Sequence, residues 1–178
     1  MFQEDLAAVY HKINSLLPLY SPLIISIDGV GDTGKTTLAN LIIEKFGGEH
    51  IEVDNYLTEG KGKYIPFIQY KSLKKDFLYA QARHPTLLII EGLCILAILK
   101  KLKIGSHLSV YIKQIDKDGS WEDERICDEN NDLAETVAYI GKYESLPGIG
   151  DADRERARYH FNFHPISNAS LVLHRIRK

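Results

Sequence analysis

The residues with the clearest capacity for chemistry lie together near the beginning of the chain. From position 29 to position 36 the sequence reads Gly-Val-Gly-Asp-Thr-Gly-Lys-Thr, which matches the pattern G-x-x-x-x-G-K-[ST] at every fixed position. Glycines allow such a segment to curl until successive backbone N–H groups face a phosphate, and the helix that follows adds the positive end of its dipole. The segment therefore predicts a phosphate loop (P-loop) that binds a nucleotide. The residues expected to contact the nucleotide are Gly29, Val30, Gly31, Asp32, Thr33, Gly34, Lys35, Thr36 and Thr37.

Two side chains of this P-loop have specific expected roles. Lys35 is expected to place its positive charge at the β- and γ-phosphates, and Thr36 to offer its hydroxyl oxygen to Mg²⁺. A glycine-rich turn with an incidental lysine is the alternative, but a buried apolar run precedes the motif and a helical pattern follows it, as nucleotide binding requires.

Two carboxylates follow segments that are predicted to be strands. Asp54 comes after residues 50–53, and Glu91 comes after Leu87-Leu88-Ile89-Ile90. In open α/β sheets, ligands bind at the carboxyl ends of the strands, so both side chains are expected beside the P-loop. Asp54 can accept the proton of an attacking hydroxyl, and Glu91 can hold Mg²⁺ directly or through water. The structural alternatives are an Asx turn for Asp54 and a helix cap for Glu91.

These residues need a sheet to position them, and the apolar pattern predicts one. Helical spacing is found over residues 5–17, 69–82 and 93–101, and in the segment from the P-loop to Phe46. The expected strands cover residues 23–27, 50–53, 87–90, 108–112 and 171–173. Strands that alternate with helices indicate a three-layer α/β fold, with a mainly parallel sheet of about five strands flanked by helices.

The whole chain of 178 residues is expected to form one domain. Residues 116–153 are polar and rich in turn residues, with a helical piece over 133–143, and they predict an excursion from the sheet that resembles a lid. His160 and His164 have the spacing of a metal-binding pair, but their aromatic neighbours favour packing.

Composition disfavours several classes of protein. The chain has 22 basic and 24 acidic residues, and this balance argues against binding nucleic acid through bulk positive charge. The basic residues at 174–178 are expected to form a solvated tail. Two cysteines make no disulfide framework, which favours the cytoplasm. No apolar run reaches the length of a membrane span, and no signal peptide is apparent, so no membrane partner is expected.

The sequence resembles the uridine kinase and phosphoribulokinase group of P-loop kinases. The resemblance lies in residues 27–29 and 34–39, in Val-Asp-Asn-Tyr at 53–56, in Ile-Ile-Glu-Gly at 89–92, and in a pattern that runs from Arg158 to Leu173. It implies a three-layer nucleoside-kinase fold that uses ATP and Mg²⁺. It also implies that Asp54 takes the position of the catalytic base and Glu91 that of the acidic residue at a strand end.

The sequence departs from this group in two places. Asn55 stands where relatives usually have a second acid or a serine. Relatives also carry an arginine-rich lid, whereas Arg125 here lies in an acidic stretch and residues 126–153 contain no arginine. Arg154, Arg156 and Arg158 follow and can supply that charge.

These features predict an ATP-dependent transfer of phosphate to a hydroxyl of a small metabolite, such as a nucleoside, a sugar or a vitamin-like compound. The chain lacks the Asn-Lys-x-Asp element expected of a GTPase and the Ser-Gly-Gly signature of transporter ATPases. The residues expected to act in catalysis are Lys35, Asp54, Arg125, Arg154 and Arg158, with Thr36 and Glu91 at the metal. A nucleotide-binding regulatory module without transfer activity and an NTP hydrolase are the alternatives.

Overall fold

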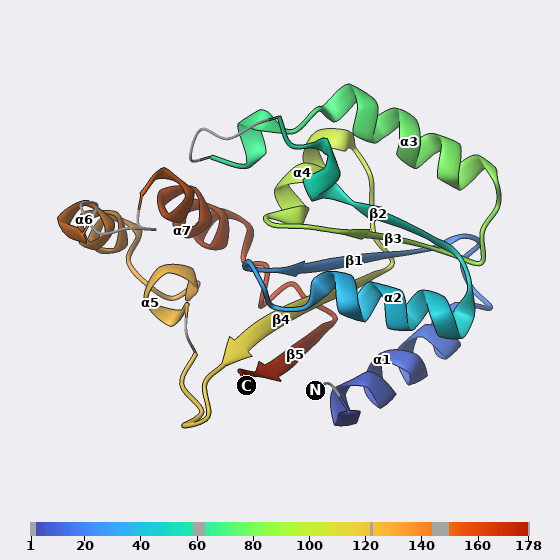
Figure 1. Cartoon of the computed structure of the whole chain (residues 1–178), viewed down its shortest axis with the longest axis horizontal. Helices are drawn as coiled ribbons and strands as arrows, with labels where there is room; N and C mark the ends of the chain where they lie inside the picture. Colours follow the sequence, from blue (N-terminus) through green and yellow to red (C-terminus); the bar gives the residue numbers. More distant parts are fainter. Residues whose placement is uncertain (1–2, 59–62, 122, 144–149, 178) are drawn as a thin grey trace.

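A five-stranded sheet runs through the centre of the computed structural model, which describes residues 3–58, 63–121, 123–143 and 150–177 (Figure 1). The strand order is β2-β3-β1-β4-β5, and all four pairings are parallel. The strands are β1 (Leu23–Gly29), β2 (Glu49–Glu52), β3 (Leu87–Glu91), β4 (Leu108–Ile115) and β5 (Leu171–Ile176). The predicted α/β fold with a parallel sheet of five strands is confirmed.

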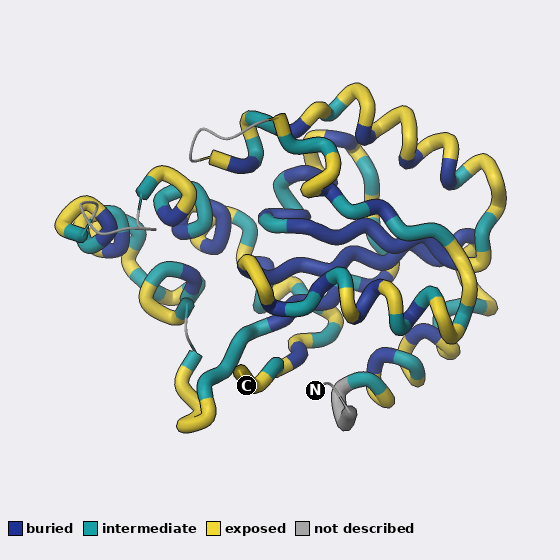
Figure 2. The backbone as a smooth tube through the Cα atoms, viewed as in Figure 1, coloured by how far each residue is buried: buried dark blue, intermediate teal, exposed yellow. Residues whose placement is uncertain are grey.

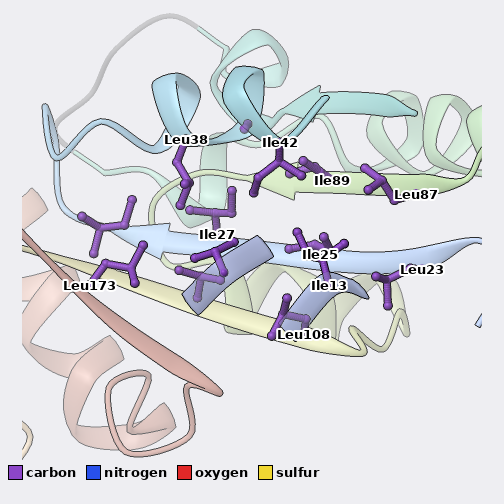
Figure 3. Close-up of a cluster of buried hydrophobic side chains, with 14 residues drawn as sticks. Ile13, Leu23, Ile25, Ile27, Leu38, Ile42, Leu87, Ile89, Leu108 and Leu173 are labelled. Atoms are coloured by element: carbon purple, nitrogen blue, oxygen red, sulfur yellow. The ribbon is translucent and has the colours of Figure 1, made fainter. Parts of the chain in front are cut away.

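Helices cover both faces of this sheet. They are α1 (Gln3–Leu16), α2 (Lys35–Phe46), α3 (Tyr70–Ala82) and α4 (Ile95–Leu102). Ile13 of α1 and Ile42 of α2 pack with Ile25 of β1 on one face, in the cluster shown in Figure 3. Phe77 of α3 and Ile98 of α4 belong to a second cluster on the other face. The central strands are therefore buried on both faces, which explains their continuous apolar sequences (Figure 2).

Three further helices lie beyond the carboxyl ends of the strands (Figure 1). They are α5 (Glu124–Cys127), α6 (Leu133–Tyr143) and α7 (Asp151–Phe163). Residues 122 and 144–149 of the predicted excursion lie outside the described residues. The helical piece expected over 133–143 is confirmed as α6.

Helix α7 was not predicted from the sequence because its buried side mixes polar and apolar residues. The residues that it buries include Asp153, Tyr159 and His160 beside Ala157. Helical periodicity is recognised by apolar residues at regular spacing, and polar side chains such as Asp153 and His160 interrupt that pattern here.

The sheet order brings the end of β3 beside the P-loop. Ile27 of β1 pairs with Glu91, the last residue of β3, and Gly29 pairs with Ile112 of β4. The P-loop therefore starts between the ends of two neighbouring strands. No helix in the described part of the chain is both long and apolar enough to cross a membrane.

The packing of α1 on the sheet can be tested with Ile13→Ala. Ile13 is fully buried, so the truncation should lower the free energy of unfolding by about 2–5 kcal/mol. Leu19→Ala, at a side chain that is 68% exposed, is the matched control and should change it by less than about 0.5 kcal/mol. Urea unfolding followed by circular dichroism measures both, and equal effects would contradict the packing of α1.

Candidate active site

The P-loop is the turn between β1 and α2, and two of its glycines are required by the backbone. Gly29 has φ +147°, and a Cβ at this position would lie 2.7 Å from the Ile112 carbonyl oxygen. Gly34 has φ +88° and directly precedes α2. Any other residue at Gly29 would clash with the backbone of Ile112. At both Gly29 and Gly34, a residue with a side chain would also be strained by the positive φ.

Two side chains of the P-loop donate hydrogen bonds to one of its own backbone carbonyl groups. The Thr33 hydroxyl and the Lys35 ammonium donate to the Val30 carbonyl oxygen at 3.0 and 2.8 Å. Val30, Thr33 and Lys35 are buried, whereas Gly31, Asp32 and Thr37 are exposed. The exposed part is therefore accessible to a ligand, and the lysine charge is held at the loop by a neutral acceptor.

Thr36 and Glu91 are in direct contact. The Thr36 hydroxyl, in the first turn of α2, donates to Glu91 Oε1 at 2.7 Å. Glu91 is only 2% exposed. Nε2 of His50, on β2, lies 3.4 Å from the same carboxylate oxygen. Three elements thus place a hydroxyl, a carboxylate and an imidazole together beside the P-loop.

This set of donors fits a divalent cation bound together with a nucleotide. A hydroxyl and a carboxylate are the oxygen ligands that Mg²⁺ prefers, and Mg²⁺ keeps most of its other positions for water and phosphate. Within the described ranges, no group of three or more His, Cys, Asp or Glu side chains could hold a metal ion. A cation at Thr36 and Glu91 would thus need ligands from the phosphates and water.

Asp54 lies at the same edge of the sheet, in a 3₁₀ turn over Val53–Tyr56 that follows β2. Its carboxylate is exposed, and Oδ1 accepts a hydrogen bond from the buried hydroxyl of Tyr64. Burial and the neighbouring Asp54 raise the pKa of Tyr64, so the phenol remains a donor. A Cβ on Gly92 would lie 2.9 Å from the Tyr64 hydroxyl oxygen, and glycine permits this close approach. Tyr64 thus connects Asp54 to the residue that follows Glu91.

Helix α7 holds Tyr64 from the other side. The backbone N–H groups of Tyr64 and Ile65 donate to Glu155 Oε2 at 2.5 and 3.1 Å. The position of Asp54 thus depends on a chain of contacts that begins on α7. The sequence did not reveal these contacts, because no recognisable motif links Tyr64 or Glu155 to Asp54.

Helix α7 is also hydrogen-bonded to Asp28, at the base of the P-loop. Asp28, the residue before Gly29, accepts hydrogen bonds from the Gly29 N–H at 2.8 Å and from the Tyr159 hydroxyl of α7. Tyr159 accepts in turn from the Leu96 N–H of α4 at 3.3 Å. Burial raises the pKa of Asp28 to about 6, although these hydrogen bonds and the charge of Lys35 lower it.

Ion pairs of Arg156 stabilise the start of α7. Arg156 contacts Asp153 on its own helix and Asp123 at 3.3 Å. The Gly150 N–H donates to Asp153 at 2.7 Å, so this buried carboxylate both caps α7 and pairs with Arg156.

The contacts of the predicted catalytic arginines lie away from the P-loop. Arg125 stacks over the Tyr139 ring at 4.7 Å, and Arg154 pairs with Asp151 at 3.3 Å. Arg158 is exposed on α7. The structure therefore places these three on or beside the helices α5–α7.

Arg175 of β5 is the arginine that contacts the P-loop. Its guanidinium donates to the Asp32 carbonyl oxygen, and Nη1 lies 3.0 Å from the position of a Cβ on Gly34. The expectation of a solvated basic tail is thus wrong for this residue, because residues 171–176 form a strand beside β4. The only sign of this role in the sequence was a basic residue close to a predicted strand.

The two histidines at metal-binding spacing do not come together. Nε2 of His160 shares a 2.8 Å hydrogen bond with the Tyr111 hydroxyl, and burial lowers the pKa of His160 to about 4. His164 is exposed and follows the end of α7. The packing interpretation is therefore confirmed for His160.

Comparisons with known proteins support the fold. No protein-family model matches the chain, and no curated protein matches it. Among solved structures, the chain is similar to one described as a possible uridine kinase from Bacillus stearothermophilus, with a TM-score of 0.52 and 14% identity over 93% of this chain and 98% of that chain. An uncharacterized protein from Eubacterium ventriosum is similar at a TM-score of 0.41 and 14% identity, over 87% of this chain and 89% of that one. The first likeness shows that the two chains share an α/β fold.

The raised pKa of Asp28 predicts a pH-dependent stability. The folded protein binds this proton more tightly than the unfolded chain, whose aspartate pKa is near 3.8. As the pH rises from about 4 to about 6, the free energy of unfolding should therefore fall by about 3 kcal/mol, and then level off. Asp28→Asn has no carboxyl group to titrate at this position. Urea unfolding of the wild type and the variant between pH 4 and pH 7 therefore isolates the contribution of Asp28. A stability difference that is constant across this range would contradict the assignment.

Proposed function

We propose that this protein transfers the γ-phosphoryl group of ATP to a hydroxyl group of a small metabolite, such as a nucleoside, a sugar or a vitamin-like alcohol. The observation that carries the proposal is the contact between Thr36 and the buried Glu91 beside a complete P-loop. The exposed carboxylate of Asp54 at the same sheet edge adds a group that can act on an acceptor.

The P-loop supports binding of a nucleoside triphosphate. Its backbone N–H groups and the start of α2 favour an anion. Lys35 donates to the neutral Val30 carbonyl, and a phosphate oxygen offers it a stronger, charge-assisted bond. The lysine is thus positioned to bind the β- and γ-phosphates.

Thr36 and Glu91 would hold Mg²⁺ together with the phosphates. The cation, when bound, would neutralise charge on the β- and γ-phosphates. Glu91 is kept in place by the Thr36 hydroxyl, and its burial limits competition from bulk water.

Asp54 would orient and deprotonate the acceptor. Its Oδ1 accepts from Tyr64, which leaves Oδ2 to accept the hydroxyl proton of the acceptor. The acceptor oxygen forms a bond to the γ-phosphorus, the bond from that phosphorus to ADP breaks, and the proton passes to Asp54. Tyr64 acts by fixing the orientation of the carboxylate.

The arginines of the α5–α7 region would neutralise the transferring group. Arg154 and Arg158 are four residues apart on α7, so both lie on one side of the helix. Either of them, or Arg125, would have to reach the phosphate from its place around α5–α7 to fill this role. Arginine suits this task because its planar fork binds two phosphate oxygens.

Nucleotide binding is tested with Lys35→Ala. Loss of a charge-assisted hydrogen bond costs about 1.5–3 kcal/mol, so the affinity for MgATP should fall about 10- to 100-fold. Isothermal titration calorimetry measures this change. Lys45→Ala, which removes an exposed lysine from the same helix, is the control and should bind as the wild type does. Equal affinities of the Lys35 variant and the wild type would overturn the P-loop assignment.

Phosphoryl transfer is tested by Asp54→Asn. Acceptor-dependent ADP formation is first screened with nucleosides, sugars and pantothenate-like alcohols. The variant keeps the shape of the side chain but cannot take a proton, so turnover should fall at least about 100-fold while ATP binding persists. Asp118→Asn, at an exposed turn far along the chain, is the control.

Three outcomes of that assay would contradict the proposal. Near-normal turnover by Asp54→Asn would show that Asp54 is not the base. ADP formation without any acceptor would indicate an NTP hydrolase. ATP binding without turnover of any acceptor would favour a regulatory module.

A further inference from the structure

A buried ring nitrogen on β2 lacks a hydrogen-bond partner. Nε2 of His50 is inaccessible to solvent, and it makes no hydrogen bond within the described part of the chain. A buried polar atom without a partner costs about 1–3 kcal/mol, and such atoms are rare in native proteins. The groups around this nitrogen therefore decide what role it can have.

The nearest charged group is the carboxylate of Glu91. Nε2 of His50 lies 3.4 Å from Glu91 Oε1, which already accepts the Thr36 hydroxyl at 2.7 Å. The oxygen thus lies between a hydroxyl from α2 and an imidazole from β2. At 3.4 Å the imidazole is about 0.5 Å beyond an ordinary N–H···O hydrogen bond.

The position of His50 on β2 indicates which group its imidazole can contact. His50 pairs with Ile89, two residues before Glu91, so its imidazole extends to the carboxylate from a position farther from the strand end. The P-loop lies at the opposite side, beyond the strand ends (Figure 1). His50 is therefore placed to contact the carboxylate and not a cation bound between Glu91 and the phosphates.

We propose that His50 is a positioning residue that orients Glu91 toward the Mg²⁺ of the proposed nucleotide site. This inference rests on the proposed function and adds to it a residue outside the P-loop and the two carboxylates. When the Thr36 oxygen turns toward the cation, a small shift of Glu91 brings Oε1 within reach of the Nε2–H donor. The buried nitrogen then gains its partner, and the carboxylate is fixed in one orientation. Groups that support metal ligands in this way typically change metal affinity 10- to 100-fold.

The test measures binding of Mn²⁺, as a substitute for Mg²⁺, to the protein–ADP complex by electron paramagnetic resonance of the free ion. His50→Leu should weaken Mn²⁺ binding about tenfold. His50→Gln carries an amide donor of comparable reach and should recover most of the affinity. His50→Asn is too short to reach Glu91 and should behave as His50→Leu does, which provides a second loss variant if leucine disturbs folding. Binding of ADP without metal should be unchanged in all three.

Two reference variants separate the possible failures. Glu91→Gln should weaken Mn²⁺ binding at least as much as His50→Leu, and His11→Leu, at an exposed site on α1, should have no effect. If Glu91→Gln weakens binding while His50→Leu and His50→Asn match the wild type, the role of His50 is overturned and the proposed function stands. If Glu91→Gln itself binds Mn²⁺ as the wild type does, the metal role of Glu91 is wrong, and the inference about His50 falls with it.

Discussion

The parallel pairing of β1 with β3 is the interaction on which the site depends. It places Glu91 beside Ile27, two residues before the P-loop begins, so the Thr36 hydroxyl can reach the carboxylate at 2.7 Å. The pairing is specified by sequence, because both strands are apolar on both faces and are buried between two helical layers. A shift of one register position would turn Glu91 to the face of α3 and α4 and break this contact.

Helix α7 joins the two halves of the candidate site. Glu155 holds the backbone of Tyr64, whose hydroxyl contacts Asp54, while Tyr159 contacts Asp28 below the P-loop. Glu155 and Tyr159 are one helical turn apart, so one side of α7 contacts both the segment that holds Asp54 and the base of the P-loop. A buried polar network is costly when one of its groups lacks a hydrogen-bond partner. In this network, each of the contacts just named is a hydrogen bond. A displacement of α7 would therefore affect both Asp54 and the base of the P-loop.

The sequence predicts what local patterns encode. The five strands, the glycine-rich turn between β1 and α2 and the proximity of Glu91 to Thr36 followed from strand patterns, glycine spacing and the rule that strand ends meet at one sheet edge. Helix α7 did not, because its buried side carries Asp153 and His160. The contacts of Tyr64 and Arg175 were also missed. Each joins segments that no motif links, and only the assembled fold brings them together.

The positive charges at the P-loop are held by neutral groups in this structure. Lys35 donates to the Val30 carbonyl and Arg175 to the Asp32 carbonyl, so both cations bind the backbone of the loop itself. The nearby carboxylate, Asp28, has a pKa raised by burial to about 6 and is occupied by Tyr159 and the Gly29 N–H. A phosphate binds a cation more strongly than a carbonyl does. On the proposed function, the two side chains could therefore transfer to a bound nucleotide without breaking an ion pair to any residue that the structure describes.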